Sequence, residues 1–237
     1  MVSSFEEVPA RDRVIVALDC GIEEAFDLAD QLQGKATWMK VGMTLFYANG
    51  PAIVYALKER GFKVFLDLKF HDIPHQVEGA AYAAAGSGAD MLTMHTVGGV
   101  DMMAAAQKGA ERAASEYGHD APATLGITVL TSMNDAALAE TGVSRAMADQ
   151  VVVLAEQAKR AEVRDDLKSG KLTLEKVLEM KNDPVVGRMK VSTLIETLPG
   201  YGKAKAEKIM KELQIAESRR LRGLGERQQT ALLERLG

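Results

Sequence analysis

Cysteine is almost absent from this chain of 237 residues, since Cys20 is its single one. One cysteine excludes an internal disulfide framework and suits a reducing compartment. Apolar runs long enough to cross a bilayer are also lacking, so no membrane partner is expected. The first residues, Met1 to Glu7, are acidic and carry no apolar signal core. We therefore expect a cytoplasmic rather than a secreted protein.

Charge is divided unevenly along the chain. The net charge is -4, but residues 1–158 hold 11 Lys and Arg against 21 Asp and Glu, whereas residues 159–237 hold 18 against 12. Such a split between two halves favours two modules with different partners. The basic half is the one suited to a polyanion.

Strand-like and helix-like segments alternate over the first two thirds of the chain. The expected strands are Arg13–Leu18, Ala36–Val41, Phe62–Leu68, Asp90–His95 and Leu125–Leu130. The expected helices are Ile22–Gln33, Pro51–Arg60, Gln76–Gly86, Val100–Tyr117 and one from Ser144 past Lys159. This spacing is typical of parallel strands joined by crossover helices. We expect an α/β fold, a partial TIM-type barrel of about five βα units.

The alternation stops after residue 154, although a closed barrel needs eight units. From there the sequence is helical, and the helices expected are Leu174–Met180, Val191–Leu198, Lys203–Leu213 and one ending near Leu236. The sequence therefore predicts an all-α domain over residues 161–237. It follows a barrel segment over residues 1–160, and the junction lies within one continuous helix.

The most informative motif is the run from Asp67 to Pro74, which reads Asp-Leu-Lys-Phe-His-Asp-Ile-Pro. Side chains two apart on a strand share a face, so Asp67 and Lys69 would lie together beside an apolar core. Holding unlike charges there is costly, so the motif indicates chemistry. The alternative is an ion-pair cluster that only stabilises the fold.

Four segments in order resemble the orotidine 5′-phosphate decarboxylases. They are Val16–Asp19, Lys40–Gly42, Asp67–Pro74 and Val129–Ser132, within residues 11–160. The resemblance implies orotidine 5′-phosphate or UMP as ligand and no metal or organic cofactor. The three histidines of this region, His71, His75 and His95, are interpreted as structural rather than metal-binding.

The resemblance also implies residue roles. The implied catalytic residues are Lys69, Asp67, Asp72 and Lys40, and the implied substrate-binding residues are Asp19, Lys40 and Thr131. Lys69 would donate a proton to C6 of the pyrimidine, within an alternating network of lysines and aspartates to which Asp72 is lent across a dimer interface. Asp19 would bind the ribose, and Thr131 the base.

The family binds the phosphate through segments of its last three βα units. No segment of this sequence resembles them. A phosphate often contributes to the chemical step as well as to affinity. Either a partner, as a homodimer or a complementing chain, supplies the missing part, or the half-barrel is a remnant without catalysis.

The basic segment, residues 159–237, contains Gly200 and Gly202 in a predicted hairpin with a predicted helix on each side. This is a helix–hairpin–helix pattern. Glycines let a backbone approach a phosphate, and the N–H groups that open the next helix face it. Four segments of this stretch, Asp166–Lys168, Val186–Ser192, Leu198–Lys203 and Arg219–Gly225, carry a resemblance to the actinobacterial integration host factor, a helix-two-turn-helix nucleoid protein. The implied DNA-binding residues are Gly200, Gly202, Lys203, Lys205, Lys208, Arg219, Arg220 and Arg222.

Two functions from different classes follow. The sequence favours a fusion protein that binds DNA with little sequence specificity and is associated with the nucleoid. The alternative is a carboxy-lyase that converts orotidine 5′-phosphate to UMP and CO₂ with Lys69 as proton donor. For the basic segment itself, the other interpretations are a helical module that binds a protein, or arginines paired with Glu207, Glu212 and Glu217.

Overall fold

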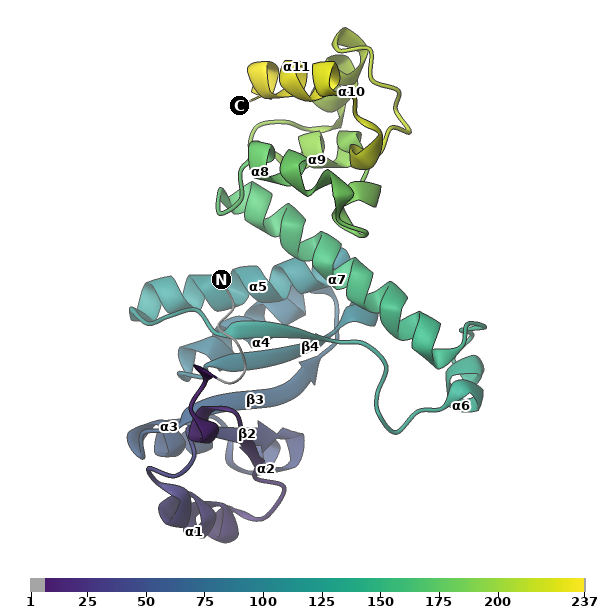
Figure 1. Cartoon of the computed structure of the whole chain (residues 1–237). Coiled ribbons are helices and arrows are strands. Elements are labelled where there is room, and N and C mark those ends of the chain that lie inside the picture. Colours follow the sequence, from purple (N-terminus) through teal and green to yellow (C-terminus); the bar gives the residue numbers. More distant parts are fainter. Residues whose placement is uncertain (1–6, 237) are drawn as a thin grey trace. The chain divides into compact units, whose positions relative to one another are not determined.

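A computed structural model describes residues 7–236 of the chain (Figure 1). The chain divides into two compact units, of which unit 1 ends at Met133 and unit 2 begins at Asn134. The acidic segment at the N-terminus lies outside the described residues except for Glu7. Residue 160, where the sequence places a domain boundary, falls within the helix α7 (Met147–Ser169), whereas the division between the two units lies earlier, between Met133 and Asn134.

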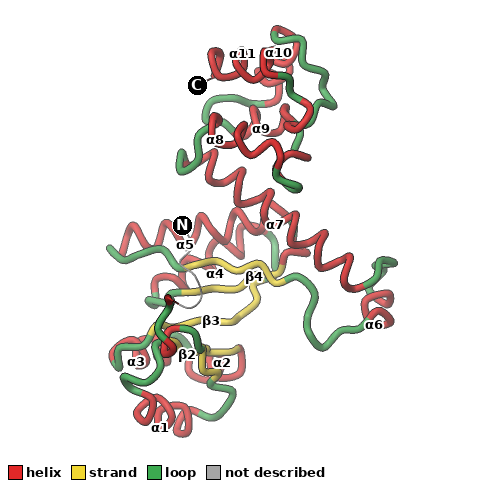
Figure 2. The backbone as a smooth tube through the Cα atoms, viewed as in Figure 1, coloured by secondary structure: helices red, strands yellow, loops and turns green. Residues whose placement is uncertain are grey.

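Unit 1 is built on a sheet of five parallel strands in the order β1-β2-β3-β4-β5 (Figure 2). The strands are β1 (Ile15–Ala17), β2 (Trp38–Gly42), β3 (Lys63–Phe70), β4 (Met91–His95) and β5 (Ala123–Ile127). The helices are η2 (Ala10–Asp12), α1 (Ile22–Leu32), α2 (Met43–Asn49), α3 (Ala52–Glu59), α4 (Pro74–Gly86), η3 (Thr96–Gly98) and α5 (Val100–Tyr117). All five expected strands are present, and the α/β architecture of a partial TIM-type barrel is confirmed.

The two faces of this sheet differ in burial. On β3, Val64, Leu66 and Leu68 are buried, whereas the alternate residues Phe65 and Asp67 are partly exposed. The buried face packs against helices that include α3, α4 and α5. The strand ends that carry the charged residues therefore open onto the other, less covered face.

The sheet has two edges. β1 and β5 each pair with one strand within the described residues, so the sheet does not close. Apolar side chains at these edges are exposed: Ile15 to 41% and Leu125 to 40%. In a closed barrel, further strands would pair with both edge strands and cover such side chains. The two edges of this sheet are therefore those of a partial barrel.

Helices α4 and α5 pack against each other through small residues. Ala81, Ala85, Ala106 and Ala110 are all fully buried. At Gly109 of α5 a Cβ atom would lie 2.2 Å from the carbonyl oxygen of Glu78 on α4. The two backbones therefore approach closely because this position has no side chain.

Unit 2 is helical. Its elements are α6 (Asp135–Glu140), α7 (Met147–Ser169), α8 (Leu174–Glu179), η4 (Met180–Asn182), η5 (Val186–Arg188), α9 (Val191–Thr197), α10 (Lys203–Glu212), η6 (Leu221–Gly223) and α11 (Glu226–Leu236). A continuous apolar core joins the later part of α7 to the elements that follow, and residues such as Leu194 and Leu221 are 1% exposed or less. No helix within residues 7–236 combines the length and the apolar character needed to cross a membrane.

One carboxylate fixes the chain between η4 and η5. Oδ1 of Asp183 accepts hydrogen bonds from the backbone N–H groups of Val185 at 2.8 Å and Val186 at 2.9 Å. Oδ2 of Asp183 binds Nζ of Lys159 on α7 at 2.6 Å. The bond from Lys159, and then those from the two backbone N–H groups, lower the pKa of Asp183 to about 2.

Candidate catalytic and nucleic-acid-binding sites

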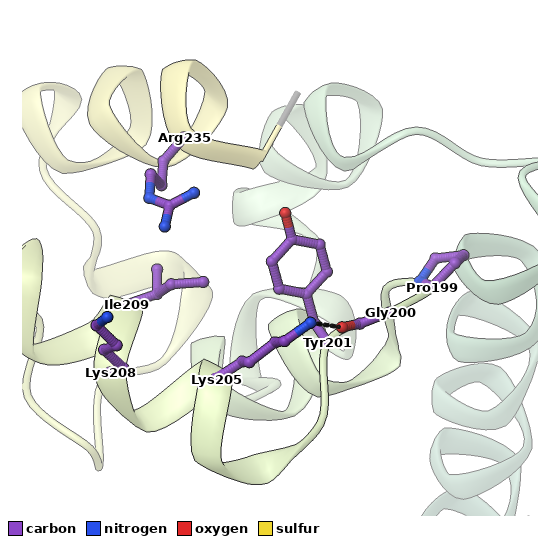
Figure 3. Close-up of a pocket in the computed structure, with 7 residues that line it drawn as sticks. All are labelled: Pro199, Gly200, Tyr201, Lys205, Lys208, Ile209 and Arg235. Carbon is purple, nitrogen blue, oxygen red and sulfur yellow. Dashed lines mark hydrogen bonds between the residues drawn. The ribbon is translucent and has the colours of Figure 1, made fainter.

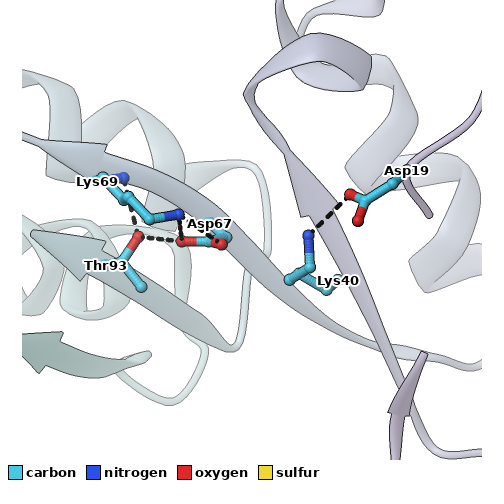
Figure 4. Close-up of polar contacts among 5 residues, drawn as sticks. All are labelled: Asp19, Lys40, Asp67, Lys69 and Thr93. Carbon is cyan, nitrogen blue, oxygen red and sulfur yellow. Dashed lines mark hydrogen bonds and ion pairs between the residues drawn. The ribbon is translucent and has the colours of Figure 1, made fainter. Parts of the chain in front are cut away.

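The ion pair of Asp67 and Lys69 lies near the carboxyl end of β3. Nζ of Lys69 is 2.9 Å from both carboxylate oxygens of Asp67 (Figure 4). The side chains are 14% exposed for Asp67 and 26% for Lys69, so the pair is shielded but reachable. The sequence predicts that these two residues share a face, and the structure brings them into direct contact.

A third residue completes this cluster and was not foreseen from the sequence. Oγ1 of Thr93 on β4 accepts a hydrogen bond from the backbone N–H of Lys69 and donates one to Oδ1 of Asp67, both at 2.9 Å. Thr93 is fully buried. The one sign of Thr93 in the sequence is that it lies two residues before His95, the polar end of the strand that pairs with β3.

A second ion pair joins β2 to the loop after β1. Nζ of Lys40 lies 3.0 Å from Oδ1 of Asp19 (Figure 4). A Cβ at Gly42 would lie 3.5 Å from each of these two atoms, so the glycine leaves room beside the pair. Lys40 pairs with Phe65 in the sheet, and so it faces the same side as Asp67. Of the expected network of Lys40, Asp67, Lys69 and Asp72, the ion pairs among residues 7–236 join Lys69 to Asp67, whereas Lys40 pairs with Asp19 instead.

Histidines lie beside the pair of Asp67 and Lys69. The rings of His71 and His95 are 5.5 Å apart between centroids. Burial lowers the pKa of His95, and the nearby positive charges of His71 and Lys69 lower it further. Within the described part of the chain no group of three His, Cys, Asp or Glu residues could hold a metal ion.

Two of the sequence-predicted residues lie outside the cluster. Asp72 is exposed and its Oδ1 accepts a hydrogen bond from the N–H of Ile73 at 2.6 Å, immediately before α4. Thr131 is exposed in the turn after β5. The roles proposed for these two side chains, at a subunit interface and at the base, stay predictions.

The hairpin of unit 2 forms a pocket of about 490 Å³ (Figure 3). It is lined by Pro199, Gly200, Tyr201, Lys205, Lys208, Ile209 and Arg235. Gly200 has a φ of +83°, which a side chain would strain, and Gly202 is the N-cap of α10. Nζ of Lys205 binds the carbonyl oxygen of Gly200 at 2.8 Å and lies 5.8 Å from the centre of the Tyr201 ring. The sequence did not reveal Arg235, which the fold brings from α11.

The three arginines after α10, Arg219, Arg220 and Arg222, are exposed, and two of them bind backbone carbonyls. Arg219 donates to the carbonyl oxygen of Gly223 at 3.3 Å, and Arg220 donates to that of Arg188. Glu212, an expected partner, pairs instead with Lys208 and Arg235. The interpretation in which the arginines serve to pair with that carboxylate is therefore wrong for Glu212.

Comparison with known proteins identifies relatives of this chain. The family model described as "Orotidine 5'-phosphate decarboxylase / HUMPS family" matches residues 12–205, further along the chain than the sequence motifs indicate. The orotidine 5'-phosphate decarboxylase of Maridesulfovibrio salexigens is 47% identical over 123 residues, which are 52% of this chain and 53% of that protein. One from a Synechococcus strain is 41% identical over 157 residues, 65% of this chain and 64% of that protein. The chain spans about half to two thirds of the length of these curated relatives.

Solved structures also show similarity to this chain. A structure of sIHF bound to an 8bp palindromic DNA is 44% identical and covers 36% of this chain and 97% of that chain, with a TM-score of 0.35. The orotidine 5'-phosphate decarboxylase of Lactobacillus acidophilus is 30% identical and covers 85% of this chain and 98% of that chain, with a TM-score of 0.59. Because the family model also matches well over half of the sequence, this chain belongs to the orotidine 5′-phosphate decarboxylase / HUMPS family.

Proposed function

We propose that unit 1 carries out the decarboxylation of orotidine 5′-phosphate to UMP, with Lys69 as the proton donor. The observation that carries the proposal is the contact of Nζ of Lys69 with both oxygens of Asp67 at 2.9 Å, on the open face of the sheet. Family membership supports this function. Family membership also supports decarboxylation better than it supports DNA binding, the function that the sequence alone favoured.

The chemistry follows from charge. Decarboxylation breaks the bond between C6 and the carboxylate carbon and leaves the electron pair on C6. A fixed positive charge at that point stabilises the transition state. Lys69 supplies this charge and then transfers a proton from Nζ to C6, and the neutral amine regains a proton from water. Asp67 holds the ammonium group in place, and its own charge beside the substrate carboxylate raises the energy of the ground state.

The ribose of the substrate would lie beside the second ion pair, which joins Asp19 to Lys40. Asp19 is exposed at 72% of its side chain, while its partner Lys40 is 21% exposed. The carboxylate can therefore accept hydrogen bonds from ribose hydroxyls and keep its bond to Nζ of Lys40. In this proposal Lys40 fixes Asp19 for the ribose and adds positive charge to the face that holds Lys69.

The phosphate end needs groups that we do not assign to unit 1. The sheet is open at β1 and β5, and the chain matches only part of the length of its relatives. We propose that a complementing chain pairs with these edges and supplies the remaining βα units with the phosphate contacts. Turnover by the chain alone is then slow, because binding energy from the phosphate supports the chemical step.

The test follows the absorbance of orotidylate with purified protein, alone and mixed with the part of the Maridesulfovibrio relative that lies beyond its matched segment. We expect turnover that rises in the mixture. Lys69→Ala should lower the rate by about 10²–10⁴-fold, as for loss of a general acid. Lys63→Ala, at the other end of β3, is the matched control and should keep the rate. Absence of turnover in both samples, or full activity of Lys69→Ala, contradicts the proposal.

A second function is favoured by the cationic pocket of unit 2. We propose that the hairpin binds DNA phosphates through the opening N–H groups of α10, with Lys203, Lys205 and Lys208 nearby. The pocket that Lys205 and Lys208 line supports this proposal, as does the binding of Arg219 and Arg220 to backbone carbonyls, which leaves them without a carboxylate among the described residues. The affinity would come mostly from phosphate neutralisation, with little sequence specificity.

A fluorescence titration on random duplex DNA at low and at physiological salt tests this second function. We expect the affinity to fall by about tenfold or more with salt, because bound counterions are released. Lys203→Gln should weaken binding and reduce the slope of log K against log salt by about 1. Lys176→Gln, an exposed lysine of α8, is the control and should have no effect. Lack of binding at low salt, or binding that salt does not change, contradicts it.

A further inference from the structure

The backbone at the reactive lysine is strained. Lys69 has a φ of +51°, in the left-handed region that residues with a side chain seldom adopt. The pairing of β3 with β4 also changes register between Leu66 and Phe70. A bulge of this kind re-aims the side chains it contains, and it persists only where the surroundings hold it.

Thr93 is the group that holds this bulge. Its Oγ1 accepts a hydrogen bond from the N–H of Lys69 at 2.9 Å, which a regular ladder would have used for a carbonyl of β4. The same oxygen donates its proton to Oδ1 of Asp67 at 2.9 Å. A hydroxyl is both donor and acceptor, so one buried atom contacts the backbone of one reactive residue and the side chain of the other.

We propose that Thr93 is a positioning residue that sets the reactive lysine of unit 1. Its hydroxyl fixes the backbone N–H of Lys69. The same hydroxyl fixes Oδ1 of Asp67, which is one of the two carboxylate oxygens that bind Nζ of Lys69 (Figure 4). The inference rests on the proposed decarboxylation. It adds that the geometry of the pair depends on a neutral hydroxyl from the neighbouring strand.

Two variants separate the hydroxyl from the packing of Thr93. Thr93→Val keeps the shape of the side chain and removes both hydrogen bonds, whereas Thr93→Ser keeps the hydroxyl and removes the methyl group. In Thr93→Val we expect kcat for orotidylate to fall by about 10²-fold with little change in KM, as for a misplaced catalytic group. We expect Thr93→Ser to retain most of kcat.

A readout that needs no turnover accompanies the kinetics. Labelling by an amine reagent, read by mass spectrometry, gives the ratio of modified Lys69 to modified Lys63 within one sample. Loss of the Thr93 hydroxyl should free the Lys69 side chain and raise this ratio in Thr93→Val but not in Thr93→Ser. A general loss of stability would not change the ratio selectively, and thermal melting shows whether both variants fold.

The outcomes distinguish the two proposals. If wild-type protein lacks turnover but the ratio rises in Thr93→Val, the decarboxylase function fails and the positioning role stands as a structural fact. If Thr93→Val is folded and keeps both the wild-type ratio and the wild-type kcat, the positioning role is wrong. Equal damage in Thr93→Ser and Thr93→Val would assign the effect to packing and would also overturn it.

Discussion

The two units differ in how completely each covers its own apolar surface. In unit 2 the core joins the later part of α7 to the elements after it, and Leu194, Ile195 and Leu221 are 1% exposed or less. In unit 1 one face of the sheet is buried, but Ile15 and Leu125 at the edges are about 40% exposed. Unit 2 encloses its core, while unit 1 has a covered face and an open one.

This difference shows which part of the candidate site forms on an open sheet and which part would need a closed barrel. The Lys69 and Asp67 pair is formed by neighbouring residues of one strand and by Thr93 from the next strand. Such a cluster needs only local pairing, and so it forms on an open sheet. A closed pocket for a whole nucleotide needs strands from around the barrel.

The largest expected effect compares one leucine in each unit. Leu194→Ala in unit 2 should cost about 2–5 kcal/mol of unfolding free energy, because a buried cavity remains. Leu125→Ala at the edge of the sheet should cost about 1 kcal/mol or less, since water already reaches that side chain. Urea unfolding of both variants measures the difference, and equal costs would show that the face of unit 1 is covered.

A smaller effect concerns the close contact of α4 and α5. Gly109→Ala places a methyl group against the carbonyl oxygen of Glu78 and should cost about 1–3 kcal/mol by overpacking. Gly79→Ala is the matched control, because no atom lies within 4 Å of the added Cβ. That control should stabilise the helix by about 0.5–1 kcal/mol. Stabilisation by both changes in thermal melts would contradict the close packing.

The smallest effect is a pH dependence of unit 2. The pKa of Asp183 is lowered from 3.8 to about 2 in the folded chain. A carboxyl whose pKa is lowered by folding contributes stability above pH 3.8, and this stability is lost as the pH falls towards 2. Asp183→Asn should therefore be less stable than wild type at neutral pH. The difference in urea midpoints should shrink below about pH 4, and a constant difference would exclude the titration of Asp183.

The secondary structure could be predicted where the pattern was long or strongly periodic. Helix α5 was expected with its observed limits, Val100–Tyr117, and all five strands were expected. Helix α2 was missed because it begins at Met43, directly after β2 ends at Gly42, with no separating turn. Helix α6 was also missed, although Asn134 caps it by accepting the N–H of Ala137 at 2.9 Å. The Asn-Asp pair that opens it was a usable signal.

The site was predictable as far as neighbours along one strand determine it. That Asp67 and Lys69 lie near each other follows from their spacing. The role of Thr93 does not, because it depends on the bulge and on the left-handed backbone of Lys69. Arg235 joins the hairpin pocket through the packing of α11, which no local pattern encodes.

The most direct test of the central claim is a titration of the isotopically labelled full chain with UMP, followed by two-dimensional NMR of the backbone amides. UMP is the product of the proposed reaction and should bind the open face of unit 1. We expect shifts at the amides of Asp19, Lys69 and Thr93, whether or not the phosphate of UMP also shifts the hairpin from Gly200 to Lys208. Shifts confined to that hairpin, or no shifts at any UMP concentration, would contradict a pyrimidine nucleotide site in unit 1.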